Sequence, residues 1–321
     1  MPQSYRNQLA DVLRKHSNLF AVDDFEVGTI PGMHHVINTG DAPPFRQKLR
    51  RHPPLHEKVI EEQVQLMLKR GLCRPSNSPF VSNVVLAKKA SGSWRLCIDH
   101  RQLNAQTVAD SFVCPRVEDT IHTLSGAKYF SQLDIRQAYS HLLIKPEHIH
   151  KTAFIVKSGL YEMTKGCFGL STMPASWSRA ISFVLDNLAP QICACYFDDI
   201  TIYSTDLPTV IDRIDKVLSH PSEFNLKLNP DKCKFLQTSI EILGYTVSAD
   251  GVTTQHSKVT AIADWPACKT AKEVKSFLGI CSYYRSRMQV TLQLVQYSAS
   301  NKRTESSKFW PMQAANCHQP K

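Results

Sequence analysis

Two adjacent carboxylates interrupt an apolar, β-prone stretch at residues 191–204, and this feature constrains the fold more than any other. The apolar runs on both sides of Asp198 and Asp199 predict two strands joined by a tight turn, with the acids at the tip of the hairpin. Adjacent like charges repel unless a cation lies between them, which favours a divalent metal such as Mg²⁺. The alternative is an acidic turn with solvated side chains, because the pair Asp23 and Asp24 shows that two adjacent acids alone indicate little.

Tyr196, Asp198 and Asp199 between two such strands resemble the catalytic hairpin of reverse transcriptases. From about residue 10 to residue 287, other segments are similar to the polymerase region of gypsy-type LTR retrotransposons and occur in the same order. These segments begin at Asn38, Arg74, Gly92, Leu103, Ala127, Phe168, Leu226, Leu243 and Phe277. The resemblance implies an α+β fold of the right-hand polymerase type, with an antiparallel palm sheet flanked by helices, fingers and a partial thumb.

The resemblance and the chain pattern together predict five parts. They are an N-terminal segment at 1–40, fingers at 41–120, a palm at 121–235 with a fingers insertion near 145–170, a primer grip and partial thumb at 236–287, and a divergent, disordered tail at 288–321. The tail is polar and lacks a hydrophobic period, which is typical of disorder.

Apolar residues at helical spacing predict helices at 9–13, 55–67, 177–188 and 210–218. Gly71 is the expected stop of the second of these helices, and Ser171 or Thr172 is the expected N-cap of the third.

The chain carries 38 basic and 28 acidic residues, a formal charge of +10, which favours a polyanionic partner such as nucleic acid over a merely basic surface. No apolar run approaches the ~18 residues of a membrane span, and the N-terminus lacks a signal-peptide core. We therefore expect no membrane partner and an intracellular location, in the cytoplasm, in virus-like particles or in the nucleus. The ten cysteines form no Cys-x-x-Cys pair and are expected to be reduced. The oligomeric state is left open.

A third carboxylate, Asp134, ends the alternating stretch 128–135, which predicts a strand. On local grounds, an acid after a strand is equally typical of a helix N-cap. Asp134 matches the first catalytic motif of the family. This match implies that Asp134 and Asp198 hold two Mg²⁺ ions, with Asp199 as the weaker ligand and Mn²⁺ as a substitute.

A predicted hairpin at 84–99 carries Lys88 and Arg95 near each other across its turn. Two fixed cations suit a triphosphate, although exposed hairpin cations without a partner are the local alternative. In reverse transcriptases the matching hairpin belongs to the fingers. The resemblance therefore implies that both cations contact the incoming nucleotide.

The resemblance also assigns roles to three residues farther along the chain. Tyr139 would lie under the nucleotide sugar, where its ring would collide with a ribose 2′-hydroxyl; a core tyrosine on a helix is the alternative. Phe168 would pack near the nucleotide, and Gly169 would let the backbone come close.

The implied function is an RNA-directed DNA polymerase, a nucleotidyltransferase that adds deoxynucleotides to a primer 3′-hydroxyl. Its partners would be deoxynucleoside triphosphates and an RNA or DNA template-primer. Gly166 and Cys167 replace a Met-Pro that relatives carry, so a catalytically impaired, nucleic-acid-binding remnant of a retrotransposon is the alternative. After Tyr284 the chain offers a single acid, Glu305, which predicts no ribonuclease H site.

Overall fold

The structure is a computed structural model that describes residues 2–88, 92–112, 115–266 and 268–284. The predicted tail at 288–321 lies outside the described residues. The chain divides into two compact units, Met1–Gln237 and Thr238–Lys321. Within the described ranges, no helix is long and apolar enough to cross a membrane.

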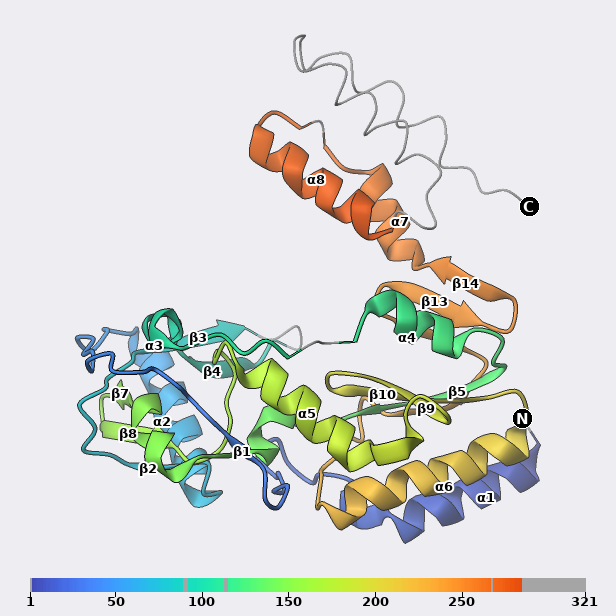
Figure 1. Cartoon of the computed structure of the whole chain (residues 1–321), viewed down its shortest axis with the longest axis horizontal. Helices are drawn as coiled ribbons and strands as arrows, with labels where there is room; N and C mark the ends of the chain where they lie inside the picture. The colour runs from blue at the N-terminus through green and yellow to red at the C-terminus, as the bar shows by residue number, and fades with distance from the viewer. Residues whose placement is uncertain (1, 89–91, 113–114, 267, 285–321) are drawn as a thin grey trace. The chain divides into compact units, whose positions relative to one another are not determined.

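An antiparallel sheet of four strands lies at the centre of the first unit (Figure 1). Its order is β11–β5–β10–β9, with β5 (Tyr129–Asp134), β9 (Cys193–Tyr196), β10 (Asp199–Ser204) and β11 (Lys234–Gln237). The two central strands bury the side chains of Phe130, Leu133, Ile200 and Ile202. Aromatic and branched residues of this kind are favoured in strands. The strand predicted at 128–135 and the predicted acidic hairpin are both confirmed.

Helices cover this palm sheet. α6 (Leu207–Glu223) packs on β10 and β5, α1 (Gln3–Lys15) packs on α6, and α4 (Val117–Leu124) packs on β9 (Figure 1). α5 (Met173–Leu185) packs on α6 and buries Trp177 and Ile181, as their spacing predicted. Two short 3₁₀ helices, η1 (Ser17–Leu19) and η4 (Asp186–Leu188), follow α1 and α5.

The predicted cap of α5 is wrong in its mechanism. Thr172 occupies the N-cap position, but its side chain forms no capping hydrogen bond. Its backbone is already helical, with φ −92° and ψ −5°, whereas a capping side chain normally reaches the helix from extended backbone. Pro174 in the first turn has a fixed φ and no N–H that needs a partner, so it favours the helix start instead. Leu188, predicted in the same helix, lies in η4.

The fingers region combines short sheets with one long helix. Its antiparallel sheet has the order β2–β8–β7, with β2 (Cys73–Pro75), β7 (Phe154–Val156) and β8 (Gly159–Met163), and its hairpin consists of β3 (Val84–Lys88) and β4 (Trp94–Ile98). α2 (Pro54–Lys69) contacts β2 and β4, and Gly71 follows it with a φ of +66°, which confirms the predicted stop. The remaining elements are β1 (His34–His35), α3 (Arg101–Gln106), η2 (Ala138–His141), β6 (Leu143–Ile144) and η3 (Pro146–Thr152).

The second unit is a three-stranded antiparallel sheet followed by two helices. Its elements are β12 (Ser239–Ile242), β13 (Tyr245–Ser248), β14 (Gly251–Thr254), α7 (His256–Ala263) and α8 (Ala271–Tyr283). Leu243 and Gly244 form a tight turn between β12 and β13, both with positive φ, as a two-residue hairpin turn requires. The hydroxyl of Tyr283 donates to the carbonyl oxygen of Leu243 at 2.7 Å, so the end of α8 is tied to this turn.

Candidate active site

A two-residue turn of Phe197 and Asp198 joins β9 to β10, which begins at Asp199. Phe197 has a φ of 52°, a left-handed conformation that costs about 1–2 kcal/mol for an L-residue. Two donors hold its carbonyl oxygen, Nε1 of Trp177 at 3.0 Å and the thiol of Cys195 at 3.7 Å. Backbone strain held in place by surrounding contacts is typical of functional sites, and here it lies at the predicted acidic tip.

Strand pairing brings the third acid to the same place. Asp199 and Asp134 are direct partners across the antiparallel pair of β10 and β5. The backbone N–H of Ile135 donates to the carbonyl oxygen of Asp198 at 3.1 Å, which ties the chain after Asp134 to the turn. Side chains directly opposite each other in such a pair have Cβ atoms about 4.5–5.5 Å apart. The three acids predicted to be catalytic therefore gather at one end of the palm sheet.

Asp198 has the most unusual electrostatic environment of the three. Its pKa is raised from 3.8 to about 6, chiefly by burial and then by the charges of Asp199 and Asp134. The pKa of Asp199 is also raised, by loss of surrounding water and by the charge of Asp134. Oδ1 of Asp198 is buried and receives no hydrogen bond from the described residues. Such an oxygen is costly to ionise, and a bound cation would relieve this cost.

A lysine ammonium lies against the acidic cluster. Nζ of Lys232 donates to Oδ2 of Asp134 at 2.9 Å, and its charge lowers the pKa of Asp198. In the part of the chain that the structure describes, no three His, Cys, Asp or Glu side chains are arranged to hold a metal ion. The three carboxylates nevertheless fit Mg²⁺ in kind, because carboxylate oxygens are its usual protein ligands and one of these oxygens accepts no hydrogen bond from the residues that the structure describes. Lys232 supplies one of the positive charges that this cluster requires.

Three of the five predicted nucleotide-binding residues contact one another. The rings of Tyr139 and Phe168 lie 4.9 Å apart at an angle of 56°, and the guanidinium carbon of Arg95 lies 5.0 Å from the centre of the Phe168 ring. Phe168 remains 38% exposed although it is a large apolar side chain. Tilted ring pairs and cations over rings are both attractive. The three side chains therefore form one surface from three separate parts of the sequence.

Gly169 has a backbone conformation that favours glycine. Its φ is +99°, and a Cβ there would lie 3.3 Å from the carbonyl oxygen of Ile98, so both conformation and space favour glycine. Nδ2 of Asn104 donates to the carbonyl oxygen of Gly169 at 2.7 Å, and the N–H of Ser171 donates to Oδ1 of Asn104 at 2.9 Å. Asn104 thus holds this loop, a role that a single asparagine does not reveal in the sequence.

The two residues that depart from the family pattern are closely packed. Sγ of Cys167 lies 3.4 Å from Nε2 of His100, and burial lowers the pKa of His100 to about 4, so the imidazole is neutral near pH 7. A Cβ at Gly166 would lie 2.3 Å from the carbonyl oxygen of Tyr139, so a larger residue requires a shift of the backbone. The backbone at Gly166 and the thiol of Cys167 therefore both lie close to neighbouring groups.

The hairpin register separates Lys88 from Arg95. Lys88 pairs with Trp94, and Ala87 pairs with Arg95. Side chains directly opposite each other share a face of the hairpin, and successive side chains alternate between faces. Arg95 therefore projects from one face, where it contacts Phe168, and Lys88 from the other. The expectation that the two cations lie near each other is wrong for their side chains, which project from opposite faces, although their backbones are close across the hairpin.

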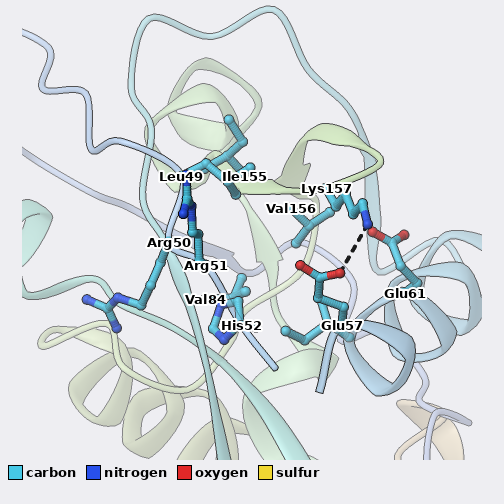
Figure 2. Close-up of a pocket in the computed structure, with 11 residues that line it drawn as sticks. Leu49, Arg50, Arg51, His52, Glu57, Glu61, Val84, Ile155, Val156 and Lys157 are labelled. Atoms are coloured by element: carbon cyan, nitrogen blue, oxygen red, sulfur yellow. Dashed lines mark hydrogen bonds and ion pairs between the residues drawn. The ribbon is translucent and has the colours of Figure 1, made fainter. Parts of the chain in front are cut away.

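A cavity of about 250 Å³ lies beside the basic run that precedes α2 (Figure 2). Figure 2 shows Arg50 and Arg51 on one side, and Glu57 and Lys157, which form an ion pair at 3.1 Å, on the other. Apolar side chains complete the lining, among them Leu49, Ile60, Val84, Ile155 and Val156. The cavity is therefore lined by both charged and apolar side chains.

Asn83 anchors this basic run. Its Oδ1 accepts from the N–H of Arg50 at 2.8 Å, and its Nδ2 donates to the carbonyl oxygen of Lys48 at 2.8 Å. Asn83 is buried, and a proline at this position would offer neither contact.

Part of the chain matches a known protein family. Residues 86–247 match the family described as Reverse transcriptase (RNA-dependent DNA polymerase). The retrovirus-related Pol polyprotein from transposon 297 of Drosophila melanogaster is 36% identical over 283 residues, which cover 87% of this chain and 27% of that protein. The retrovirus-related Pol polyprotein from transposon gypsy of the same species is 31% identical over 293 residues, 89% of this chain and 28% of that protein.

Solved structures show the same fold. The foamy viral protease-reverse transcriptase dRH in complex with double-stranded DNA superposes with a TM-score of 0.86 at 21% identity, over 94% of this chain and 53% of that one. The foamy viral protease-reverse transcriptase in complex with an RNA/DNA hybrid gives a TM-score of 0.81 at 20% identity, over 94% and 40% of the two chains. The predicted right-hand polymerase fold is confirmed.

The matches differ greatly in length from this chain. It spans only 27% and 28% of the two Drosophila polyproteins. The family match, the acidic hairpin and the ordered sequence similarity agree with one another. The chain belongs to the reverse transcriptase (RNA-dependent DNA polymerase) family, and its sequence fits the reverse transcriptase region of a gypsy-type LTR retrotransposon Pol polyprotein.

Proposed function

We propose that this chain is an RNA-directed DNA polymerase whose chemistry takes place at Asp134, Asp198 and Asp199. The acidic cluster is the observation that carries the proposal: three acids meet at adjacent strand ends, and a buried oxygen of one of them has no donor among the residues described. Such a cluster requires cations when its acids are ionised. Phosphoryl transfer requires cations at the same place, because the reacting groups are anionic.

Asp134 and Asp198 are the proposed ligands of two Mg²⁺ ions, with Asp199 as a weaker ligand and Mn²⁺ as a substitute. When bound, the ions would lower the pKa of the primer 3′-hydroxyl and neutralise the triphosphate and the leaving pyrophosphate. The protein's own part is to hold the carboxylates. The pairing of β5 with β10 fixes Asp134 and Asp199, and the hydrogen bond from Trp177 fixes the turn that carries Asp198.

Arg95, Phe168 and Tyr139 are the proposed contacts of the incoming deoxynucleoside triphosphate. A guanidinium binds phosphate oxygens in bidentate fashion, and the stacking of Arg95 on Phe168 restricts its orientation beforehand. Phe168 also restricts the ring of Tyr139, which is the proposed barrier to a ribose 2′-hydroxyl. Gly169 would let its backbone approach the nucleotide, and Lys88 would be a peripheral contact.

An RNA or DNA template-primer is the proposed macromolecular partner. The chain has a formal charge of +10, and Arg46, Lys48, Arg50 and Arg51 are concentrated before α2 beside the fingers cavity. Fixed cations bind nucleic-acid phosphates with release of counterions. The foamy viral proteins with the same fold were solved with double-stranded DNA and with an RNA/DNA hybrid.

A nucleic-acid-binding remnant without turnover is the second candidate, and it depends on Gly166 and Cys167. Cys167 packs against His100, and Gly166 packs against the backbone of Tyr139. These contacts argue against a disrupted nucleotide-binding site. Polymerase activity is therefore the function supported best.

Primer extension on a poly-ribonucleotide template with Mg²⁺ separates the two candidates. The wild type should extend the primer, and a variant with Asp198→Asn and Asp199→Asn should bind the same template-primer without extending it. Binding by both proteins with extension by neither would favour the remnant. A hybrid labelled on its RNA strand, incubated in parallel, tests the predicted lack of ribonuclease H activity.

A further inference from the structure

A short acidic segment near the N-terminus contacts the catalytic part of the palm. Within residues 18–26, here called the acidic strap, Asp23, Asp24 and Glu26 each form an ion pair with a cation from a different part of the first unit. Asp23 pairs with Arg70 after α2, Asp24 with a cation after β5, and Glu26 with a cation after α6. The strap that contains this acidic pair therefore contacts three separate segments.

Glu26 fastens the strap to the segment that follows α6. Its Oε1 lies 2.9 Å from Nζ of Lys227, and its Oε2 accepts from the N–H of Val22 at 2.7 Å. Both contacts hold the pKa of Glu26 below its usual value, the backbone bond more strongly. Backbone bonds add to this: the N–H of Leu228 donates to the carbonyl oxygen of Leu19 at 2.7 Å. At Phe20 the strap therefore forms a parallel β-bridge with Leu228.

Asp24 holds Arg136, a cation that follows Asp134 closely in the sequence. Its Oδ1 lies 2.7 Å from Nη2 of Arg136, only two residues after Asp134 in the chain. Nη1 of the same guanidinium donates to Oδ1 of Asn229 at 2.6 Å. The side chain of Arg136 is only 13% exposed, unlike those of most surface ion pairs, so its position is set by these partners. Nε of Arg136 also donates to the carbonyl oxygen of Asp23 at 3.3 Å. A guanidinium with three partners has little freedom to rotate.

Asn229 transmits this arrangement to the acidic cluster. Its backbone N–H donates to the carbonyl oxygen of Asp134 at 2.8 Å, which fixes the end of β5. Its carbonyl oxygen accepts from the N–H of Lys232 at 3.2 Å and so forms the turn that aims the Lys232 ammonium at Asp134. One asparagine therefore receives the guanidinium on its side chain and orients both Asp134 and Lys232 through its backbone.

We propose that the acidic strap and Arg136 position Asp134 for the divalent cation of the acidic cluster, with Arg136 acting through Asn229. The proposal rests on the proposed function only in taking Mg²⁺ as that cation. Arg136 is thus a positioning residue, and Asp24 is the residue that holds it in place. Removing the charge of Asp24 weakens one of the three contacts that hold the guanidinium, and the end of β5 then loses part of a constraint that pairing with β10 alone does not supply.

Two readouts test this without turnover. The first is the Mg²⁺ concentration that gives half of the Mg²⁺-induced rise in melting temperature. The second is the hydrogen exchange of the Ile135 amide, which donates to the carbonyl oxygen of Asp198. Asp24→Asn and Arg136→Lys should each raise the Mg²⁺ midpoint by about threefold to tenfold, in the range of measured couplings between linked sites, and should speed the exchange of Ile135.

Conservative and matched variants isolate the strap from general destabilisation. Asp24→Glu keeps the carboxylate and should restore most of the wild-type Mg²⁺ midpoint. Asp11→Asn removes an exposed ion pair with Arg14 on α1 and should leave both readouts unchanged. A fall in melting temperature in Asp24→Asn and Arg136→Lys, with an unmoved Mg²⁺ midpoint and unmoved exchange of Ile135, would overturn the proposal. Failure of the wild type to extend a primer would reject the proposed function. The Mg²⁺ midpoint and the exchange of Ile135 would still test whether the strap positions Asp134.

Discussion

Nζ of Lys232 lies 2.9 Å from Oδ2 of Asp134, so the acidic cluster of the palm is partly neutralised by the protein itself. The ammonium and a metal ion would act on the same negative charge. This relationship makes the stability of the fold depend on Lys232 chiefly when no divalent cation is bound.

Replacing Lys232 should therefore destabilise the protein in a Mg²⁺-dependent manner. In Mg²⁺-free buffer, Lys232→Gln should lower the free energy of unfolding by less than about 1 kcal/mol, because the lysine side chain is 63% exposed and screened by water. Saturating Mg²⁺ should reduce the difference in the free energy of unfolding between Lys232→Gln and the wild type. Thermal melts of Lys216→Gln, which removes a similarly exposed ion pair with Asp212, provide the control. If Lys232→Gln lost the same free energy of unfolding with and without Mg²⁺, Lys232 would not be neutralising the acidic cluster.

Neutralising Asp198 should stabilise the metal-free fold at neutral pH. Its pKa is raised in the folded state from 3.8 to about 6, so the folded protein binds the proton more tightly than the unfolded chain does. The contribution of Asp198 to stability therefore falls as pH rises from about 4 to about 6, by about 2 kcal/mol in order of magnitude. Chemical denaturation should show Asp198→Asn to be more stable than the wild type at about pH 7.5, with the advantage lost near pH 4. An advantage that persists unchanged at the lower pH would contradict the raised pKa.

Tyr139 should control the choice between ribonucleotides and deoxynucleotides. Its ring is held against Phe168, where the proposed nucleotide sugar lies. Tyr139→Ala should raise the relative incorporation of ribonucleotides by roughly tenfold, equivalent to about 1.4 kcal/mol, and Tyr139→Phe should keep the wild-type preference. Single-nucleotide incorporation gives the ratio of kcat/KM values directly. A ratio that stays constant in Tyr139→Ala would leave the ring with a packing role only.

The two hairpin cations should contribute unequally to nucleotide binding. Arg95 lies on the face that contacts Phe168, whereas Lys88 shares the other face with Trp94. Arg95→Ala should lower kcat/KM for deoxynucleotides by roughly tenfold to a hundredfold, as expected for a charge-assisted bond to phosphate. Lys88→Ala should change it by less than about threefold, as is typical of an exposed charge. Equal losses in the two variants would require a different arrangement of the hairpin around the nucleotide.

The sequence predicted those parts of the site that depend on local pattern. The alternation before Asp134 and the apolar runs around Asp198 are strand signals, and the resemblance placed the two strands in one palm. Long-range partners left no comparable signal. Arg136 and Asp24 are 112 residues apart, and the sequence around neither residue indicates that they form an ion pair.

Registers and packing details also had to come from the structure. Lys88 and Arg95 fall near the same predicted turn, but the pairing of Lys88 with Trp94 decides which face each side chain takes. The sequence pattern alone does not fix that pairing, because the turn length sets the register of a hairpin. Thr172 likewise has the right identity for a helix cap, but its backbone conformation prevents the cap.

Single-nucleotide incorporation by Asp134→Asn, with template-primer affinity measured in parallel, tests the central claim most directly. Asp134 ends β5, whereas Asp199 begins β10 and Asp198 lies in the turn before it. The pairing of β5 with β10 brings Asp134 to the other two acids. The account predicts that incorporation falls by at least about a hundredfold, as expected when a group that stabilises transition-state charge is removed, while affinity for the template-primer stays within about threefold. Incorporation at the wild-type rate by Asp134→Asn would contradict the claim that this acidic cluster is where the polymerase chemistry takes place.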